Sequence, residues 1–538
     1  MKFWISNLYH ALETSVDIMI YGAGMYAKEV YPVLKKMGLK QKIKAFVVTD
    51  MDKSPTEIDG ISVCSIDELN VCNTKNITML IAVSDRYYLE IVKTIQKYKF
   101  RELLLLKPFI LTEQELVQST DEHFLEYIQE SYLWNQVNCI QEFNQEKVKH
   151  NEWIQQRKIQ DENNKNIVFI IGNFGPRYIN IIGSLVRKGY NVKILEYGNA
   201  RADYIKNALI SEYAIECINC SDLIEVSFYV LQEKPFVYYI EPVWGDCSLP
   251  QIMIKHKKIL GKIVLSLYDV LNDAYICASE YQKNIERYSL ENADGVVWRW
   301  FSKDFLENKK GFAYTGKSIQ FLDYCGKDRI RKETSSTDKL KLCMVVGNIE
   351  FLLRANFDEN ETYIDLAKIE HILEKIGNQD NCIFHLFVGR CSIKDKEVCD
   401  ALEKKYHNVK FFNTLQHNEL IQKVSEYDYG CLIYNDNALP SDRGIMTYSN
   451  YGSGYYNGVT NKLFDYISAG IPFITTGPYK LCQFFEQYGV VVKMNVSDLD
   501  INYLMKHAAY YKEKAQKARV ELYVDNHIQK LIDFLHTL

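Results

Sequence analysis

Residues 461–476, with the sequence NKLFDYISAGIPFITT, combine a short helical segment, a glycine and a buried strand. We expect Gly470 to end the helix, because glycine adopts the left-handed conformation that many helix C-termini need. Residues 471–476 are rich in β-branched and aromatic side chains, which is typical of a strand inside a parallel sheet. Lys462 and Asp465 fall at the start of the helix, next to its free backbone N–H groups. Such a corner suits a diphosphate joined to a ribose, with the cation and N–H groups on the phosphates and the carboxylate on the hydroxyls.

The length and charge of the chain limit the classes of protein to which it can belong. At about 150 residues per domain, 538 residues predict about three domains. A net charge of -5 gives no basic footprint for nucleic acid, so no nucleic-acid partner is expected. His10, Glu13 and Asp17 interrupt the apolar core that a signal peptide would need, and the apolar runs are too short to span a membrane. We expect a cytoplasmic protein; contact with the inner face of a membrane, and the oligomeric state, stay open.

The 14 cysteines do not form a metal-binding pattern. Cys217 and Cys220 make a C-x-x-C pair, but no second pair completes a zinc site. Small buried thiols in a reducing compartment are the simpler interpretation. We therefore expect no metal.

Strands alternate with helices in three parts of the chain. This pattern predicts an α/β fold with three Rossmann-like, doubly wound domains. The limits we expect are 1–110, 166–330 and 339–538, the last including terminal helices. Residues 111–165 lack both glycine and proline and predict a helical connector, including one long helix over residues 123–144.

A glycine-rich turn follows the first strand. Gly22, Gly24 and Ala27 form G-x-G-x-x-A directly after the strand at 16–21, which is a nucleotide-binding fingerprint in the right context. Asp50 follows the second strand, where an acidic residue would meet a ribose. The alternative is that the small residues only let the first helix pack on the sheet. Both interpretations stay open.

Three segments of the first part carry a resemblance. They are YGAGMYAKEV (21–30), AFVVTD (45–50) and DGISVCSIDEL (59–69). This part resembles the N-terminal Rossmann-like domain of bacterial sugar O-acyltransferases. The hexapeptide-repeat β-helix that carries the acyltransferase activity of those enzymes does not follow here.

The rest of the chain, residues 166–538, carries a second resemblance. It lies in NIVFIIGNFGPRYINIIGSLVRKGYNVKILE (166–196), LENADGVVWRWFSKDFL (290–306), KLKLCMVVGNI (339–349), IFHLFVG (383–389), NVKFFNTLQHNELIQKVSEYDYGCLIYN (408–435) and NKLFDYISAGIPFITT (461–476). In order and spacing these segments are similar to the GT-B glycosyltransferases of the group 1, or family 4-like, superfamily. The resemblance implies a first domain that binds the acceptor and a second that binds a nucleotide-sugar donor, a UDP- or GDP-sugar, with no further cofactor.

The resemblance implies roles for residues of the helix that begins near Asn461. Lys462, Tyr466 and Gly470 match a K-x-x-x-Y-x-x-x-G pattern whose lysine contacts the donor diphosphate. Asp465 stands where many of these enzymes have a glutamate that binds the donor ribose. Asn461 and these two charged residues are therefore candidate donor-binding residues, although Lys462 and Asp465 would also be ordinary residues in a first helical turn.

A second set of candidate donor residues follows the strand at 340–346. Gly347 and Asn348 form the turn, and Arg354 matches a phosphate-binding arginine of the superfamily. The lysine that often follows this arginine is absent. Asn457 stands where the retaining enzymes have the first glutamate of a Glu-x7-Glu pair, so the chain departs from that pattern.

An inverting enzyme would need a base near the acceptor. Asp269 and Glu241 are the leading candidates because both are expected just past strand ends, where open α/β sheets build their sites. Asp246 and His256 are further candidates. A carboxylate at a strand end can also be an ordinary cap or loop residue, and His417 is most simply the first residue of a helix.

The hypothesis favoured by these patterns is a glycosyltransferase that moves a sugar from a nucleotide-sugar donor to a glycan, lipid-linked or protein acceptor in surface polysaccharide or glycoconjugate synthesis. Two alternatives stay open. One is a sugar-nucleotide epimerase or an NAD-dependent sugar-modifying enzyme. The other is a non-catalytic GT-B-like scaffold that binds a partner.

Overall fold

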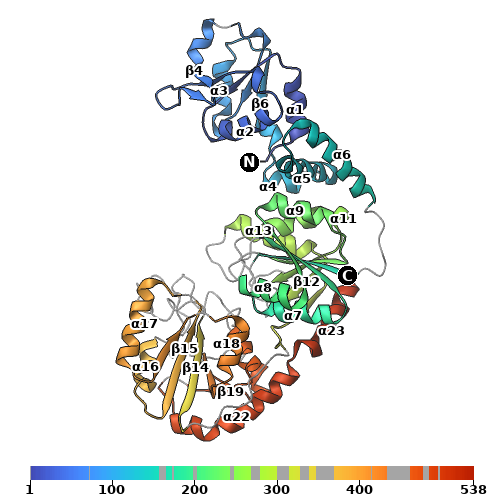
Figure 1. Cartoon of the computed structure of the whole chain (residues 1–538). Coiled ribbons are helices and arrows are strands. Elements are labelled where there is room, and N and C mark those ends of the chain that lie inside the picture. Colours follow the sequence, from blue (N-terminus) through green and yellow to red (C-terminus); the bar gives the residue numbers. More distant parts are fainter. Residues whose placement is uncertain are drawn as a thin grey trace. The chain divides into compact units, whose positions relative to one another are not determined.

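The protein is built on three sheets of mainly parallel strands, which confirms the predicted α/β fold class (Figure 1). The computed structural model describes residues 2–71, 73–156, 165–172, 175–197, 203–242, 247–267, 279–299, 314–326, 338–346, 369–389, 391–413, 415–432, 461–475, 484–494 and 497–538. Two compact units form: unit 1 comprises Met1–Asn163, Ser221–Lys234 and Lys255–Leu260, and unit 2 comprises Asn164–Cys220, Pro235–Ile254 and Gly261–Leu538. The expected domain limits stay a prediction.

The first sheet, in unit 1, has the strand order β3-β4-β2-β1-β5-β6, and every pair is parallel except β3 with β4. From β1 the chain continues to β2 on one side, whereas from β5 it continues to β6 on the other. The carboxyl ends of β1 and β5 thus form a topological switch point. The elements are α1 (Ile5–Glu13), β1 (Asp17–Tyr21), α2 (Met25–Lys36), β2 (Ile43–Val48), β3 (Glu57–Ile58), β4 (Ile61–Ser65), β5 (Ile77–Ile81), α3 (Tyr88–Ile95) and β6 (Glu102–Leu105).

Helices make up the rest of unit 1. They are α4 (Glu113–Gln118), α5 (Asp121–Gln136), α6 (Ile140–Gln156), α9 (Leu223–Gln232) and α11 (Lys257–Leu260). The predicted single helix over 123–144 is wrong, because the chain breaks between α5 and α6. At the break, the Asn138 N–H donates to Glu142 Oε2 at 2.7 Å, which ties the segment before α6 to the first turn of that helix.

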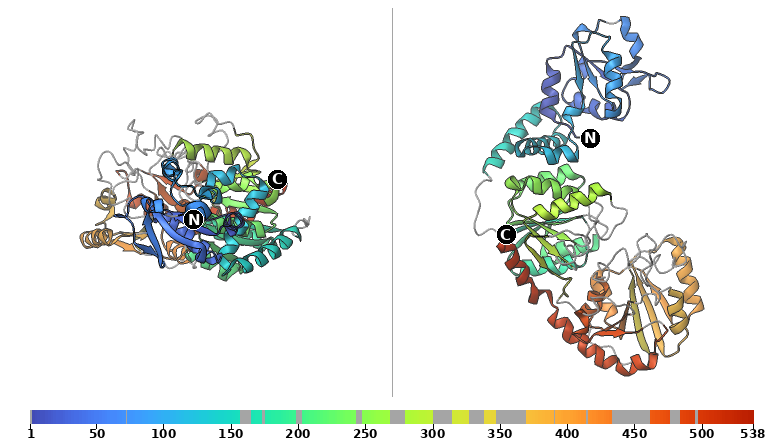
Figure 2. Two further views of the ribbon diagram at one scale, coloured as in Figure 1. Left: turned by 90° about the horizontal axis from the view of Figure 1, so that it is seen from above. Right: turned by 180° about the vertical axis from the view of Figure 1, so that it is seen from behind.

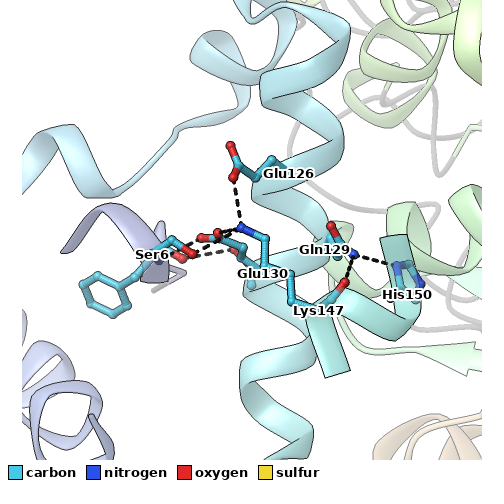
Figure 3. Close-up of polar contacts among 8 residues, drawn as sticks. Ser6, Glu126, Gln129, Glu130, Lys147 and His150 are labelled. Carbon is cyan, nitrogen blue, oxygen red and sulfur yellow. Dashed lines mark hydrogen bonds and ion pairs between the residues drawn. The ribbon is translucent and has the colours of Figure 1, made fainter. Parts of the chain in front are cut away.

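A buried ion-pair network joins α1 to α5 and α6 (Figure 3). Lys147 Nζ lies 2.5 Å from Glu130 Oε1 and 3.0 Å from Glu126 Oε1, and the Ser6 N–H donates to Glu130 Oε2 at 3.0 Å. Glu130 is fully buried, so its charge depends on these partners. Burial alone would lower the pKa of Lys147, but the hydrogen bonds and charges of Glu130 and Glu126 outweigh it and raise that pKa. The network therefore stabilises the charged form of Lys147.

The second sheet lies in unit 2 and is entirely parallel, with the order β13-β12-β11-β10-β7-β8-β9. Its switch point lies between β7 and β10, because β8 and β9 follow on one side and β11 to β13 on the other. The elements are β7 (Asn166–Ile171), α7 (Arg177–Arg187), β8 (Asn191–Tyr197), α8 (Asp203–Tyr213), β9 (Glu216–Cys220), β10 (Val237–Glu241), α10 (Ser248–Lys255), β11 (Ile263–Leu267), α13 (Glu280–Asn292), β12 (Gly295–Trp298) and β13 (Ser318–Gln320).

The third sheet, also in unit 2, is parallel with the order β16-β15-β14-β17-β18-β19. Its switch point lies between β14 and β17. The elements are β14 (Leu340–Val346), α16 (Ile369–Ile376), β15 (Cys382–Val388), α17 (Ile393–Lys405), β16 (Val409–Phe412), α18 (His417–Val424), β17 (Tyr429–Leu432), α20 (Asn461–Ser468), β18 (Phe473–Thr475), β19 (Val491–Lys493) and α22 (Ile501–Glu521).

The last helix, α23 (Val524–Thr537), packs on the second sheet although the third sheet precedes it in the chain. Figure 2 shows it in red beside the green helices of that sheet. Arg187 Nη2 donates to Asp525 Oδ1 at 2.7 Å, and Phe534 packs against Gly295 so closely that a Cβ there would lie 2.8 Å from its ring. The chain therefore crosses twice between the two sheets of unit 2. Among the described residues, no helix combines the length and apolarity needed to cross a membrane.

Candidate functional site

At the switch point of the third sheet, one tyrosine side chain bridges the two central strands. β14 and β17 pair only at Leu342–Tyr429 and Cys343–Gly430. Beyond this point the Tyr466 hydroxyl bridges the strands, accepting from the Val345 N–H at 3.0 Å and donating to the Cys431 carbonyl at 2.9 Å. Tyr466 is fully buried, and it fixes α20 against both strands.

Two neighbouring glycines make this arrangement possible. A Cβ at Gly430 would lie 2.4 Å from the Tyr466 ring, so the ring needs the space that glycine leaves. Gly470 has φ +71° two residues after the end of α20, which confirms the predicted glycine stop. Tyr466 and Gly470 thus position α20, whose start lies at the carboxyl edge of the sheet.

Asp465 and His417 meet at this edge. His417 is the first residue of α18, and its Nε2 lies 3.0 Å from Asp465 Oδ1 in α20. An ionised carboxylate only accepts, so with an ionised Asp465 the proton of this bond belongs to Nε2 of His417. The two side chains are 11% and 12% exposed, so the bond is largely shielded from water. Sequence reasoning treated His417 as an ordinary first helical residue and missed this contact.

Lys462 stands one helical turn before Asp465. Burial lowers the pKa of the Lys462 ammonium group; Asp465 opposes this shift, and the positive charge of Arg299 adds to it. A lysine in this position gains by binding an anion, because the anion would restore the charged form.

A small cavity adjoins the His417–Asp465 pair. Its volume is about 30 Å³, enough for about one water molecule. It lies in unit 2 between α7, α18 and α20, and it is lined by Ile179, Asn180, Gly326, His417, Asn418, Ile421 and Ser468. The polar side chains of this lining could hydrogen-bond a water molecule that bridges them.

The other candidate donor residues fall largely outside the described part of the chain. Gly347, Asn348, Arg354 and Asn457 lie in segments that the structure does not describe. Asn461 is described only as the first residue of α20. Their donor roles stay predictions.

Of the candidate bases of the second sheet, two lie outside the described residues and one lies within them. Asp269 and Asp246 lie outside the described residues. Glu241 is the last residue of β10, not a residue past its end as predicted, and it is 4% exposed at the switch point. It stays a candidate.

His256 belongs to another environment. It lies in unit 1, fully buried, with Nδ1 2.7 Å from Asp121 Oδ1 and Nε2 2.9 Å from the Leu116 carbonyl. Its ring also stacks on Phe124. Both ring nitrogens face acceptors inside the protein, so the structure assigns His256 a packing role there.

A buried charge cluster at the carboxyl edge of the second sheet was not predicted. Arg299, directly after β12, donates from Nε to Asp323 Oδ2 at 2.7 Å. Arg177, the first residue of α7, lies 3.7 Å from Asp323 Oδ1 and donates to Ser266 Oγ at 3.0 Å. All three charged side chains are at least nine-tenths buried. The sequence held one signal for this cluster. Arg299 and Asp323 each follow a strand, and Arg177 begins the helix after a strand, where side chains gather at the carboxyl edge of a sheet.

The glycine fingerprint of the first sheet lies at its switch point. Gly22 has φ +115°, and a Cβ there would lie 2.7 Å from the Ala82 carbonyl oxygen. Gly24 is the N-cap of α2 with open space around it, and Ala27 is fully buried against the sheet. Asp50 accepts the Asp52 N–H at 3.0 Å and pairs with Lys53 at the surface. The turn geometry agrees with the fingerprint, and ligand binding there stays a prediction.

No family model matches the chain. No curated protein matches it either. Solved structures do match: the pneumococcal O-GlcNAc transferase GtfA in complex with UDP and GlcNAc (9% identity, TM-score 0.44, 70% of this chain and 99% of that chain), S. aureus TarM with UDP (10%, 0.44, 69% and 99%) and the Neisseria meningitidis UDP-GlcNAc 2-epimerase (10%, 0.41, 69% and 100%). At TM-scores below 0.5, these likenesses assign no activity to this chain.

Among the described residues, no group of three or more His, Cys, Asp or Glu side chains is arranged to hold a metal ion.

Proposed function

We propose that this protein is a glycosyltransferase that moves a sugar from a UDP- or GDP-sugar to a glycan, lipid-linked or protein acceptor in the synthesis of a surface polysaccharide or other glycoconjugate. The observation that carries the proposal is the placement of Lys462 and Asp465, one turn apart on α20, at the switch point of a parallel sheet. Switch points are where open α/β sheets bind nucleotides.

Lys462 supplies the cation for the donor diphosphate. During sugar transfer the bond between the sugar and the diphosphate breaks, and negative charge grows on the leaving phosphate oxygen. A cation that is already fixed in a partly dehydrated site stabilises this charge more strongly than one in water. The lowered pKa of Lys462 reflects that environment.

Asp465 supplies an acceptor for the ribose hydroxyls. His417 occupies Oδ1, which orients the carboxylate and leaves Oδ2 for the donor. In this role His417 is a positioning residue, because it acts through Asp465.

The acceptor binds, in this proposal, at the carboxyl edge of the second sheet. The buried Glu241 and the cluster of Arg177, Arg299 and Asp323 all lie at that edge. Glu241 or Asp269 would serve as the base of an inverting reaction. The two crossings of the chain between the sheets of unit 2 support the GT-B architecture that this division of roles requires.

Thermal-shift binding to nucleotides and nucleotide sugars tests the proposal directly. The full chain and its Lys462→Met and Asp465→Asn variants are compared, with Lys506→Met, an exposed lysine of α22, as the matched control. We expect a UDP- or GDP-sugar to stabilise the wild type and the control but not the two site variants. Transfer or hydrolysis of the bound sugar then separates a transferase from an epimerase, which changes the sugar and leaves it on the nucleotide.

Two results would contradict the proposal. One is unchanged sugar transfer by both site variants, which removes the donor site from α20. The other is the absence of binding to every nucleotide sugar, which favours a scaffold.

A further inference from the structure

Unit 1 contains a groove that the proposed reaction does not use. It has a volume of about 580 Å³, within the range of small-ligand sites, and lies between α5, α6 and α9. Its lining consists of Tyr132, Leu133, Gln136, Val137, Glu142, Glu146, His150, Phe228, Tyr229 and Gln232. The groove thus combines aromatic rings with the amides of two glutamines and the carboxylates of two glutamates.

The aromatic part of the groove is a rigid platform. Phe228 is buried and stacks on Tyr132, with ring centroids 3.6 Å apart, and on His150, at 4.8 Å. Tyr229 meets Tyr132 at 70°, and their hydroxyl oxygens lie 3.2 Å apart. Three helices contribute these rings, so the platform exists only in the folded unit.

A hydrogen bond fixes the histidine of this platform. Gln129 Nε2 lies 2.9 Å from His150 Nδ1 and also contacts the Lys147 carbonyl, as Figure 3 shows. Gln129 is 1% exposed, so the amide is held by its surroundings. His150 therefore presents its ring to the groove in one orientation.

The polar groups of the groove favour an uncharged ligand. Glu142 accepts the Asn138 N–H, and Glu146 pairs with Lys149 at 2.6 Å, so both carboxylates already have local partners. The side-chain amides of Gln136 and Gln232 have no hydrogen-bond partner within the described residues. Each amide offers two donors and one acceptor, which matches hydroxyl groups that both donate and accept.

We infer that this groove binds a carbohydrate, through sugar rings that lie against Tyr132 and Tyr229 and hydroxyl groups that bond the amides of Gln136 and Gln232. A pyranose ring has an apolar face of C–H groups and a rim of hydroxyls, so it matches an aromatic surface edged by amides. The groove volume accommodates a short oligosaccharide. The binding of a sugar in this groove does not depend on the proposed function. The further step, that this sugar is part of the acceptor glycan, rests on the proposed function.

The test is binding of the labelled full chain to an array of immobilised oligosaccharides, with polylysine and tetramethylammonium as cationic probes in solution. The test variant is Gln136→Ala with Gln232→Ala, because these side chains can be removed without disturbing the ring stack. Gln145→Ala, an exposed glutamine of α6 outside the groove, is the matched control. We expect wild type and control to bind one class of glycan and the double variant to bind it roughly tenfold more weakly, since two hydrogen bonds are lost.

Lys462→Met separates this inference from the proposed function. We expect it to retain glycan binding while it loses the nucleotide sugar. Glycan binding without any transfer would uphold the groove and refute the transferase. No binding to any glycan, equal binding by the double variant, or binding only to the cationic probes would overturn the inference.

Discussion

The imidazole of His417 and the carboxylate of Asp465 lie 3.0 Å apart although 48 residues separate them in the chain. The contact joins the first residue of α18 to the middle of α20, so it ties together two helices that pack around the third sheet.

Loss of this bond should loosen α20. In His417→Ala, the largely buried Asp465 side chain loses this hydrogen-bond partner, and we expect the opening free energy of α20 to fall by about 1–3 kcal/mol. Hydrogen exchange of the α20 peptides measures it. The double variant His417→Ala with Asp465→Ala should lose less opening free energy than the sum of the two single variants, because both single variants lose the same interaction. Strictly additive losses would show that the bond contributes nothing.

The lowered pKa of Lys462 predicts a pH dependence of donor binding. The bound diphosphate requires the ammonium form, so affinity should be full below the pKa of Lys462 in the free protein and fall as pH rises through it. Because that pKa is below the ordinary 10.5, the fall should begin earlier than for an exposed lysine. Titration of nucleotide affinity between about pH 7 and pH 10 checks this expectation.

Arginine at the same position provides the control for the pH effect. Lys462→Arg stays protonated throughout this range, so its affinity should be nearly independent of pH. Lys462→Met should bind about 10- to 100-fold more weakly at neutral pH, because a hydrogen bond to a charged group is lost. If the arginine variant shows the same alkaline fall as the wild type, another group is responsible.

Gly430 should be intolerant of a side chain. Its Cβ would lie 2.4 Å from the Tyr466 ring, and the ring cannot retreat because its hydroxyl bonds both β14 and β17. We expect Gly430→Ala to destabilise this region by about 1–3 kcal/mol. Faster hydrogen exchange in α20 would show the effect.

Gly24→Ala serves as the comparison for Gly430→Ala. A Cβ at Gly24 would find no atom within 4 Å, so exchange in α20 should not change. The same variant tests the first sheet, because a methyl group there would obstruct close approach of a phosphate. Nucleotide binding lost in Gly24→Ala but kept in Lys462→Met would place the nucleotide site in unit 1 instead of on α20.

The ion-pair network of Figure 3 should depend on both of its charges. Lys147→Met leaves the fully buried Glu130 without its cation, and we expect a loss of about 3–5 kcal/mol in unit 1. Glu130→Gln with Lys147→Met should recover a large part of it. Hydrogen exchange of α5 and α6 provides the measurement, and equal losses in the single and double variants would contradict the expectation.

The sequence predicted local structure well where one short segment determined it. The helix and glycine stop around Gly470 and the glycine turn at Gly22 follow from backbone conformations that other residues adopt poorly, and both are present. The break between α5 and α6 was missed because helical periodicity on both sides concealed it.

Contacts between distant residues could not be predicted in the same way. The pairing of His417 with Asp465, and that of Arg299 with Asp323, depends on which strands neighbour each other in a sheet. A strand order such as β14-β17 is set by the packing of the whole sheet, and no local pattern encodes it. The three aromatic helices of the groove in unit 1 likewise come from two distant parts of the chain.

The return of α23 to the second sheet has a consequence for biosynthesis. At about 5–20 residues per second, α23 leaves the ribosome roughly 20 to 70 seconds after β7 does. During that interval α23 is absent. The surface around Gly295 is then not covered by Phe534, and the partners of Asp525 on α7 lack that contact. The second sheet therefore stays unfinished while the third is being made, and a chaperone that shields this surface would have its greatest effect in that window.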